Sequence, residues 1–314
     1  MTPEQRMRET GERLVEVIAR QEWLNPWGYK LEHVMAVGWD LLGGRRDRVR
    51  NVLHGTWLGH PLHPVLTDVP LGAWTTAFAL DCLDSRSRDG ADFAGAARLA
   101  LGIGIIGGVG AAMTGLTDWQ YTHDDARRTG LVHGLLNLGA LGLSAWSWSR
   151  RRSERDSWSR LASGLGYGTA LFSGFLGGNL VFRERIGVDR TEHPMEPREF
   201  VPVLFENELA DDRLQHVRAG DADVILLRSG GRLHAYGEHC PHLGAPLSDG
   251  WLSNGSIVCP WHGARFELST GSTVKGPATS PLTCFETCVR GGRIEVRLPA
   301  PEDAAIPRKT ARQR

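Results

Sequence analysis

Four apolar segments between residues 65 and 182 constrain the fold of this chain more than any other feature of its sequence. Each has the ~20 residues that a helix needs to cross a bilayer. The segments are residues 65–83, 99–116, 131–148 and 161–182. They predict an all-α bundle of four membrane-spanning helices, and therefore a multi-pass protein of the cell membrane.

Glycine spacing and polar residues inside these segments indicate how such helices would pack. The second and fourth segments have no charged residue, and both have glycines four residues apart, which lets helix backbones approach closely in lipid. These pairs are Gly104 with Gly108, Gly164 with Gly168, and Gly174 with Gly178. We expect the polar residues of the other two segments to face the bundle interior, because polar groups are costly in lipid. They are Asp68, Asp81, His133 and Asn137. A glycine-rich soluble bundle is the alternative, but glycine costs a water-exposed helix about 1 kcal/mol relative to alanine.

Residues 1–50 are mixed and charged, and we interpret them as an amphipathic lead-in at the membrane surface or in the cytoplasm. An amphipathic stretch near Val15 precedes a basic patch near Arg48. The 36 basic and 36 acidic residues balance, so the charge favours no nucleic-acid partner. The four apolar segments make membrane lipid an expected partner. The first thirty residues lack a signal-peptide pattern. We therefore expect the C-terminal domain on the cytoplasmic side, although arginines flank both ends of the segments and the positive-inside rule does not choose.

From about residue 190 the pattern changes to short β-branched and apolar runs separated by turn residues. Strands are predicted at residues 200–205, 224–227, 233–236, 256–258, 265–268 and 293–298. Gly230-Gly231, Asn254-Gly255 and Gly291-Gly292 predict hairpin turns. The fold class is thus multidomain, with a four-helix membrane domain at 51–185, a small all-β domain with antiparallel sheets at 199–298 and a disordered tail at 299–314.

Two short motifs in the all-β region concentrate metal-binding side chains. One is Cys240-Pro-His242-Leu-Gly, and the other, separated from His242 by sixteen residues, is Cys259-Pro-Trp-His262-Gly. Two thiolates and two imidazoles are the ligand set of a Rieske-type 2Fe-2S centre, in which histidines replace two cysteines on one iron. Zinc is the alternative for such a set. The prolines and glycines within both motifs make the iron–sulfur interpretation the more specific one.

Residues from about 199 to 298 resemble a Rieske domain of the ferredoxin and oxygenase-associated kind. The likeness extends over residues 225–236, 240–250, 266–271 and 276–278. It implies a 2Fe-2S cofactor, with Cys240 and Cys259 on the inner iron and His242 and His262 on the outer iron. It also implies electron transfer as the function.

Departures from the respiratory variant of this family bear on the redox potential. Ala245 and Trp261 stand where that variant has a pair of disulfide-forming cysteines, and Ala264 and Phe266 replace a serine and a tyrosine that donate hydrogen bonds to the cluster. Fewer donors stabilise the reduced cluster less. We therefore expect a low potential. Cys284 and Cys288 lie outside both motifs, and we interpret them as buried strand residues or free thiols.

Residues from about 50 to 182 resemble a bacterial family of four-helix membrane domains of unknown function. The likeness depends on residues 59–64, Gly-His-Pro-Leu-His-Pro, and on residues 67–74. The connectivity of four spans brings His60, His63, Asp68 and His133 to one face. Such residues can hold a haem b, with His63 and His133 as ligands, or a quinol, or they can simply cap helices at the membrane surface.

Together these features predict a membrane-anchored Rieske protein that exchanges electrons with a redox partner protein or a quinol. The alternatives are a redox or oxygen sensor and a ferredoxin-like electron donor in an oxygenase or reductase system. A complete Rieske oxygenase needs a further iron site of two histidines and a carboxylate. Only residues 299–314 follow the domain, so we expect an electron-transfer component with no catalytic residues of its own.

Overall fold

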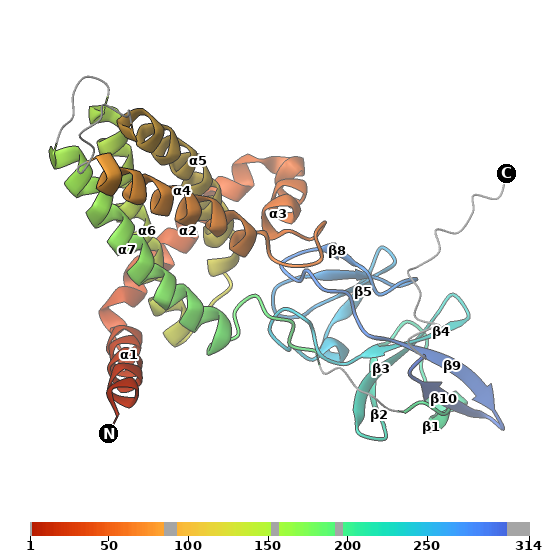
Figure 1. Cartoon of the computed structure of the whole chain (residues 1–314). Helices are drawn as coiled ribbons and strands as arrows, with labels where there is room; N and C mark the ends of the chain where they lie inside the picture. The colour runs from red at the N-terminus through yellow and green to blue at the C-terminus, as the bar shows by residue number, and fades with distance from the viewer. Residues whose placement is uncertain (1, 85–92, 152–156, 192–196, 300–314) are drawn as a thin grey trace. The chain divides into compact units, whose positions relative to one another are not determined.

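The computed structural model describes residues 2–84, 93–151, 157–191 and 197–299, which form two compact units (Figure 1). The first unit is helical and comprises the chain up to Gly55 together with Pro61–Gly187. The second comprises Thr56–His60 and the chain from Val188 onward, and is mostly β-structure. Each unit is described by itself. The expected disordered tail lies outside the described residues, except for Pro299.

The core of the helical unit is a bundle of four long helices. They are α4 (Leu62–Asp84), α5 (Phe93–Trp119), α6 (Asp124–Arg150) and α7 (Ser157–Phe182). Each contains one of the four predicted segments, and α4 packs mainly on α5 while α6 packs mainly on α7. α6 begins seven residues before its segment, with Asp124 and Asp125 in the first turn, where the helix dipole favours acidic side chains.

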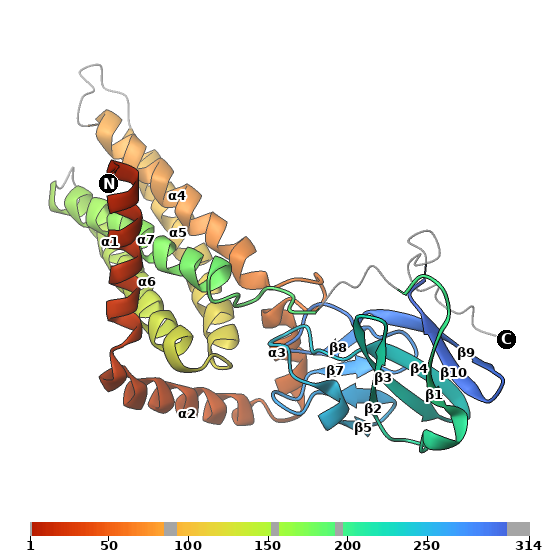
Figure 2. The ribbon, with the colours of Figure 1, turned by 90° about the horizontal axis from the view of Figure 1, so that it is seen from below.

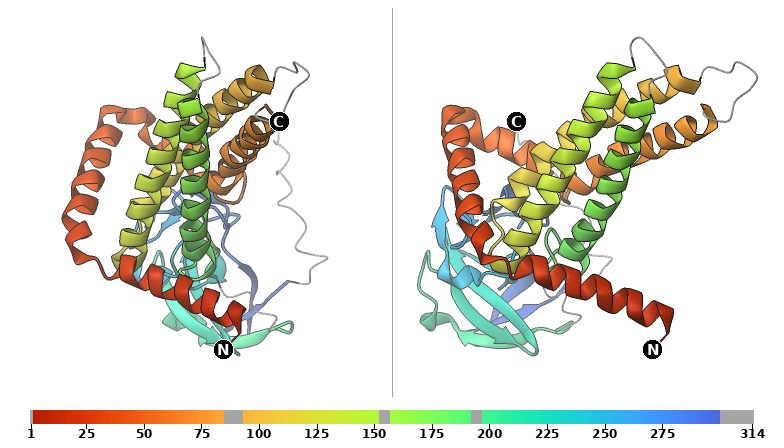
Figure 3. Two further views of the ribbon diagram at one scale, coloured as in Figure 1. Left: turned by 60° about the vertical axis from the view of Figure 1, so that its left-hand side comes forward. Right: turned by 90° about the vertical axis from the view of Figure 1, so that its left-hand side faces the viewer.

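Three shorter helices precede the bundle. They are α1 (Pro3–Ala19), α2 (Asn25–Leu41) and α3 (Arg46–His54). Thr2 and Gln5 form a reciprocal capping box that fixes the start of α1. Figure 2 shows that α2 runs across the direction of the long helices, and Figure 3 shows the same for α1. The lead-in that the sequence predicts is therefore folded onto the bundle.

One helix of the described residues, α5, is long and apolar enough by length and composition to cross a membrane. Four such helices were expected, and among the described residues one meets the criterion. α4 carries Asp68, Asp81 and Asp84, and α6 begins with four charged residues among its first five, while α7 is rich in glycine and serine. These residues lower the hydropathy of helices that nevertheless pack together as one bundle.

Polar side chains on the four helices are mostly turned inward, as expected. Asp81 is buried and receives two hydrogen bonds from Arg151, each of 2.6 Å. Asp84 is also buried and pairs with Arg160 at 3.0 Å. The expectation is wrong for Asp68, which is exposed on α4. Pairing explains the difference, because the two buried carboxylates have arginine partners that offset the cost of burial.

Glycines let the helices of the bundle approach closely, but not all at the predicted positions. A Cβ at Gly104 would lie 2.2 Å from Nε1 of Trp74, and one at Gly108 would lie 3.1 Å from Leu141. The predicted glycines Gly168, Gly174 and Gly178 have nothing within 4 Å of such an atom. On α7 the closely packed glycines are instead Gly166 and Gly177. Spacing alone thus identified the packing face of α5 but not that of α7.

The substitution Gly104→Ala is expected to destabilise the bundle by about 1 to 3 kcal/mol, because the new methyl group overlaps the buried ring of Trp74. Gly168→Ala is the matched control, since its methyl group meets open space and alanine favours a helix by about 1 kcal/mol. Thermal unfolding of the detergent-solubilised variants measures both effects. Equal midpoints for the two variants would contradict the predicted packing.

The β-unit contains two antiparallel sheets. The larger has the strand order β1-β10-β9-β4-β3-β2, and the smaller has the order β5-β6-β7-β8. The strands are β1 (Val201–Phe205), β2 (Gln215–Ala219), β3 (Ala222–Ser229), β4 (Arg232–Gly237), β5 (Trp251–Ser253), β6 (Ser256–Val258), β7 (Arg265–Glu267), β8 (Thr273–Lys275), β9 (Cys284–Arg290) and β10 (Arg293–Arg297). The predicted fold class, a helical bundle followed by a small all-β domain, is confirmed.

The three predicted hairpin turns are confirmed. Gly230-Gly231 joins β3 to β4, Asn254-Gly255 joins β5 to β6, and Gly291-Gly292 joins β9 to β10. All six residues have positive φ, as two-residue hairpin turns between twisted strands require. No ranges were predicted for β2, β5, β8 and β9, although Cys284 and Cys288 of β9 were interpreted as strand residues. β5 and β8 are short, and β2 carries polar residues on its exposed face.

Candidate metal centre

The first metal-binding motif forms a tight loop after strand β4. The amide of Cys240 donates to the carbonyl of Ala245 at 2.9 Å, and the amide of Gly244 donates to the carbonyl of Cys240 at 2.8 Å. His239 and Pro246 form a β-bridge at the base of the loop. Gly244 has φ +79°, a conformation that side chains rarely adopt.

The second motif repeats this backbone pattern between β6 and β7. The amide of Cys259 donates to the carbonyl of Ala264 at 2.9 Å, and the amide of Gly263 donates to the carbonyl of Cys259 at 3.1 Å. Val258 pairs with Arg265 at the base of the loop, and Gly263 has φ +68°. Two sequence-distant motifs thus fold into matching loops, each with a cysteine at its start and a glycine at its end.

The two cysteines form a buried thiol pair, with 1% of each residue exposed. The hydrogen bond between them raises the pKa of Cys240 well above its usual range, with burial adding to the effect, and lowers the pKa of Cys259 to about 6. Each sulfur also receives two backbone N–H groups. The donors are His242 and Leu243 for Cys240, and Trp261 and His262 for Cys259. Such donors favour negatively charged sulfur, which is the form that binds metal.

The two histidines form a second pair on the more exposed side of the loops. The ring centroids of His242 and His262 are 5.0 Å apart, with planes 85° from parallel, and both residues are half-buried. Trp261, beside His262, is 56% exposed. No group of three or more His, Cys, Asp and Glu residues within the described part of the chain is placed to hold a single metal ion. A buried thiol pair beside an imidazole pair fits the donor set of a 2Fe-2S cluster with two different irons.

The surroundings of the thiols are apolar at the two positions that bear on the redox potential. Ala264 and Phe266 are fully buried and pack in one cluster with both cysteines. The nearby hydroxyl of Tyr236 donates to the carbonyl of Leu268, and burial raises its pKa well above the usual range. Ala264 and Phe266 have no hydroxyl group, so neither can donate to the cluster the hydrogen bond that the serine or tyrosine of the respiratory variant donates.

A redox titration of the purified protein is expected to give a potential near the low end of the Rieske range, about −150 mV rather than about +300 mV. Ala264→Ser is expected to raise the potential, because a hydroxyl at this buried site can donate to the cluster sulfurs. Ala278→Ser, elsewhere in the same core cluster, serves as the comparison. A wild-type potential well above zero would contradict this prediction.

Cys284 and Cys288 lie on β9, outside both loops. Both are half-buried free thiols, and burial raises the pKa of Cys284. Cys284 packs against the core cluster that contains the metal-binding loops. The prediction that they are strand residues is confirmed, but both are half-buried rather than buried.

The helical unit brings together two of the four residues assigned to a membrane site. The rings of His63 on α4 and His133 on α6 are 6.4 Å apart at their centroids. Nδ1 of His63 donates to the carbonyl of Ala111 at 2.8 Å, and Nδ1 of His133 donates to the carbonyl of Ser173 at 2.8 Å. Both rings thus keep Nε2 as the acceptor nitrogen, and that of His133 accepts from the amide of Asn137 at 3.1 Å.

The other two residues are not part of this ring pair. Asp68 is exposed on α4, and His60 is grouped with the second compact unit. Glycines on the neighbouring helices leave room for the two rings, since a Cβ at Gly115 would lie 2.7 Å from the ring of His63 and one at Gly177 would lie 3.0 Å from that of His133. Of the four residues, the structure therefore brings His63 and His133 together.

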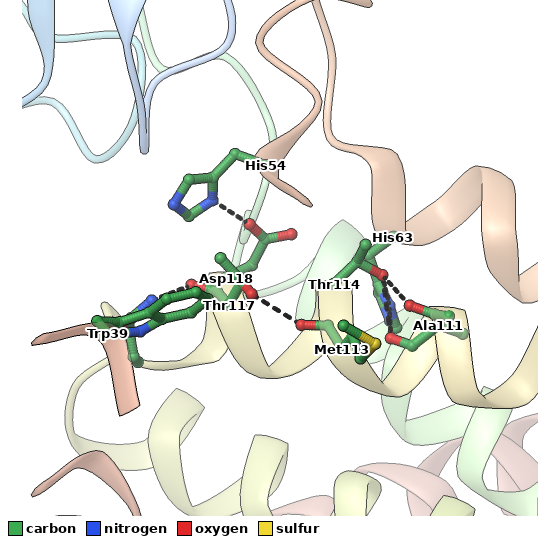
Figure 4. Close-up of polar contacts among 10 residues, drawn as sticks. Trp39, His54, His63, Ala111, Met113, Thr114, Thr117 and Asp118 are labelled. Atoms are coloured by element: carbon green, nitrogen blue, oxygen red, sulfur yellow. Dashed lines mark hydrogen bonds and ion pairs between the residues drawn. The ribbon is translucent and has the colours of Figure 1, made fainter. Parts of the chain in front are cut away.

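Sequence reasoning missed a histidine–carboxylate pair in the same unit. His54 ends α3, is 1% exposed, and its Nδ1 lies 2.7 Å from Oδ1 of Asp118 on α5 (Figure 4). Figure 4 also shows His63 of α4, which lies against Ala111 and Thr114 of α5. No spacing rule could have paired His54 with Asp118, because 64 residues separate them. The carboxylate orients the ring, and Nε2 of His54 is buried with no hydrogen-bond partner among the described residues.

Comparisons with known proteins agree with this division of the chain. The Rieske [2Fe-2S] domain family matches residues 199–286. A family described as a predicted membrane protein (DUF2231) matches residues 59–190. These matches confirm both resemblances that the sequence suggested, and they support a location at the membrane.

Individual relatives match the Rieske part. Human "Apoptosis-inducing factor 3" is 37% identical over 110 residues, which are 34% of this chain and 18% of that protein, so the chain spans less than a fifth of it. The ferredoxin of carbazole 1,9a-dioxygenase from Nocardioides aromaticivorans IC177 is a solved structure with 26% identity and a TM-score of 0.31, covering 32% of this chain and 98% of the ferredoxin. The 3-phenylpropionate/cinnamic acid dioxygenase ferredoxin subunit of Escherichia coli K12 is 40% identical over 77 residues, which are 24% of this chain and 73% of the subunit. The chain therefore belongs to the Rieske [2Fe-2S] family, and its Rieske domain follows a domain of the DUF2231 family.

Proposed function

We propose that this protein is a membrane-anchored Rieske electron carrier, whose cluster is held by Cys240, His242, Cys259 and His262. The observation that carries the proposal is the pair of matching loops, which place two buried thiols beside two half-buried imidazoles. Loaded with a 2Fe-2S cluster, these four residues supply one-electron exchange. The cysteines would hold the inner iron, and the more exposed histidines the iron nearer to a partner.

Analysis of the purified, detergent-solubilised protein tests this assignment. We expect two irons and two sulfides per chain, together with a rhombic electron paramagnetic resonance spectrum that appears on reduction. A chain that binds one zinc ion and no sulfide would contradict it. Flotation with liposomes tests the attachment to the membrane, and protease access in inverted vesicles tests whether the Rieske domain is cytoplasmic.

The names of the relatives favour a soluble electron acceptor. The Escherichia coli relative is the ferredoxin subunit of a dioxygenase, and we infer that this chain likewise donates electrons to an oxygenase or reductase component. Turnover with an electron donor and such an acceptor measures this directly. A redox or oxygen sensor would instead show different protease sensitivity between α7 and β1 in its oxidised and reduced forms, without electron transfer.

The helical unit contributes a second redox site, in which His63 is the acceptor for a quinol hydroxyl. Nδ1 of His63 is held by the carbonyl of Ala111, and its Nε2 has no hydrogen-bond partner among the described residues. Nε2 of His133 already accepts from Asn137, so bis-imidazole haem ligation would first require that contact to break. These contacts favour a quinol over haem b.

Electron exchange between the cluster and a quinol–quinone couple tests this second site. We expect His63→Ala to abolish oxidation of the dithionite-reduced cluster by a short-chain quinone, while dithionite still reduces the cluster. His33→Ala, at an exposed position on α2, is the control. A haem spectrum that disappears in His63→Ala and His133→Ala would show haem in place of quinol, and unchanged oxidation of the cluster by the quinone in both would leave the pair with a structural role only.

A further inference from the structure

Helix α2 packs on the bundle with one side only. Leu31 and Met35 contact the cluster formed by Trp119 and Leu131, near the end of α5 and the start of α6. A Cβ at Gly28 would lie 3.3 Å from the side chain of Arg127. The side of α2 that carries these residues is therefore covered by protein.

A second side of α2 is apolar and uncovered. It carries the outer stripe, which we define as Trp27, Val34, Val37 and Leu41, each between 49% and 83% exposed. From Trp27 to Leu41 the successive spacings are seven, three and four residues, which places these side chains along one face of a helix. Lys30 lies within this stripe, with its Nζ 4.8 Å from the ring centroid of Trp27. A lysine in this position can extend its amine toward a polar surface while its stem stays apolar.

The remaining side of α2 is more polar. His33 and Asp40 are exposed there, and Asp40 pairs with Arg46 at 2.9 Å. α2 thus has three sectors, one docked on protein, one apolar and exposed, and one polar and exposed. A helix lying in the plane of a membrane surface needs this arrangement, with its apolar sector toward the acyl chains and its polar sector toward water.

The position of α2 within the helical unit identifies lipid as what covers the stripe. α2 runs across the direction of the long helices, at the end where α5 finishes and α6 begins (Figure 2). α5 is the most apolar helix and exposes Ile106, Val109 and Met113. Trp27 and Lys30 of the α2 face match the side chains that gather at the boundary between acyl chains and headgroups.

We propose that α2 is an in-plane membrane helix whose outer stripe lies in the boundary region of the bilayer. This inference rests on the membrane attachment in the proposed function, and assigns a lipid surface to a segment N-terminal to the DUF2231 match. It also sets the rotation of α2, with the outer stripe toward lipid and His33 and Asp40 toward water.

Nitroxide scanning of α2 in lipid nanodiscs tests this orientation. Single cysteines at positions 34 and 37 probe the outer stripe, and cysteines at 33 and 40 are matched controls on the same helix. Cys82, Cys284 and Cys288 are first replaced by alanine, while Cys240 and Cys259 are kept as proposed cluster ligands. Power saturation is expected to show several-fold greater access of oxygen than of a water-soluble nickel chelate at 34 and 37, and the reverse at 33 and 40.

Each other outcome overturns the inference. Equal access of the nickel chelate at 34 and 33 would place the stripe in water. Low access of both reagents at 34 and 37, with dipolar coupling between labels of two chains, would show a second copy of the protein on this face. Liposome flotation and the cluster spectrum of the same samples separate the two proposals, because a protein that floats and has its cluster keeps the proposed function even where the labels contradict the orientation.

Discussion

Replacing Cys240 or Cys259 by serine is expected to abolish assembly of the 2Fe-2S cluster almost completely. Both thiols are buried to 1% exposure at the start of matching loops, and a serine oxygen is a hard, poor ligand for iron–sulfur chemistry. Iron and sulfide content per chain, together with the reduced-state spectrum, measures the loss. Cys284→Ser and Cys288→Ser are the matched controls, because these thiols lie on β9 outside both loops. A wild-type spectrum in Cys259→Ser would refute the ligand assignment.

Histidine ligands are expected to respond differently from the cysteines. His242→Cys or His262→Cys keeps a ligand of the kind that iron–sulfur clusters prefer, so iron should be retained. The added thiolate brings negative charge to the cluster and should lower its potential. A cluster lost in the cysteine-to-serine variants but retained at lower potential in these variants would separate the two pairs of ligands by their chemistry.

Removing the arginine partner of Asp81 is expected to be the most damaging single change in the helical unit. Arg151 makes two hydrogen bonds of 2.6 Å to Asp81, and both side chains are less than a tenth exposed. Arg151→Met leaves a buried carboxylate without its partner, which typically costs about 3 to 5 kcal/mol. Thermal unfolding in detergent should show a midpoint lowered by roughly 10 °C.

Two comparisons make this stability prediction specific. The double variant Asp81→Asn with Arg151→Met removes both charges and should recover much of the loss. Arg20→Met removes the exposed ion pair with Glu16 on α1 and should change the free energy of unfolding by less than about 1 kcal/mol. A single Arg151→Met variant as stable as the wild type would show that this pair contributes nothing to the fold.

The sequence alone determined the features that depend on neighbours along the chain. Apolar segments of helical length located α4 to α7, and two-residue turns located three hairpins. The Cys-Pro and Gly residues of the two motifs predicted two turns between strands, and both are present as tight loops. Local chemistry suffices in these cases, because turn conformation and helix formation are decided within a few residues.

Only the tertiary structure decided which side of each helix faces inward. Successive residues of a helix point in directions about 100° apart, so a small rotation exchanges buried for exposed positions. Packing between helices therefore placed His63 beside His133, left Asp68 exposed, and brought Gly177, in place of Gly174 or Gly178, against a neighbouring helix. The same packing joined His54 to Asp118 and left the outer stripe of α2 uncovered. These contacts join residues far apart in the sequence, where no periodicity within one segment can set the rotation of another.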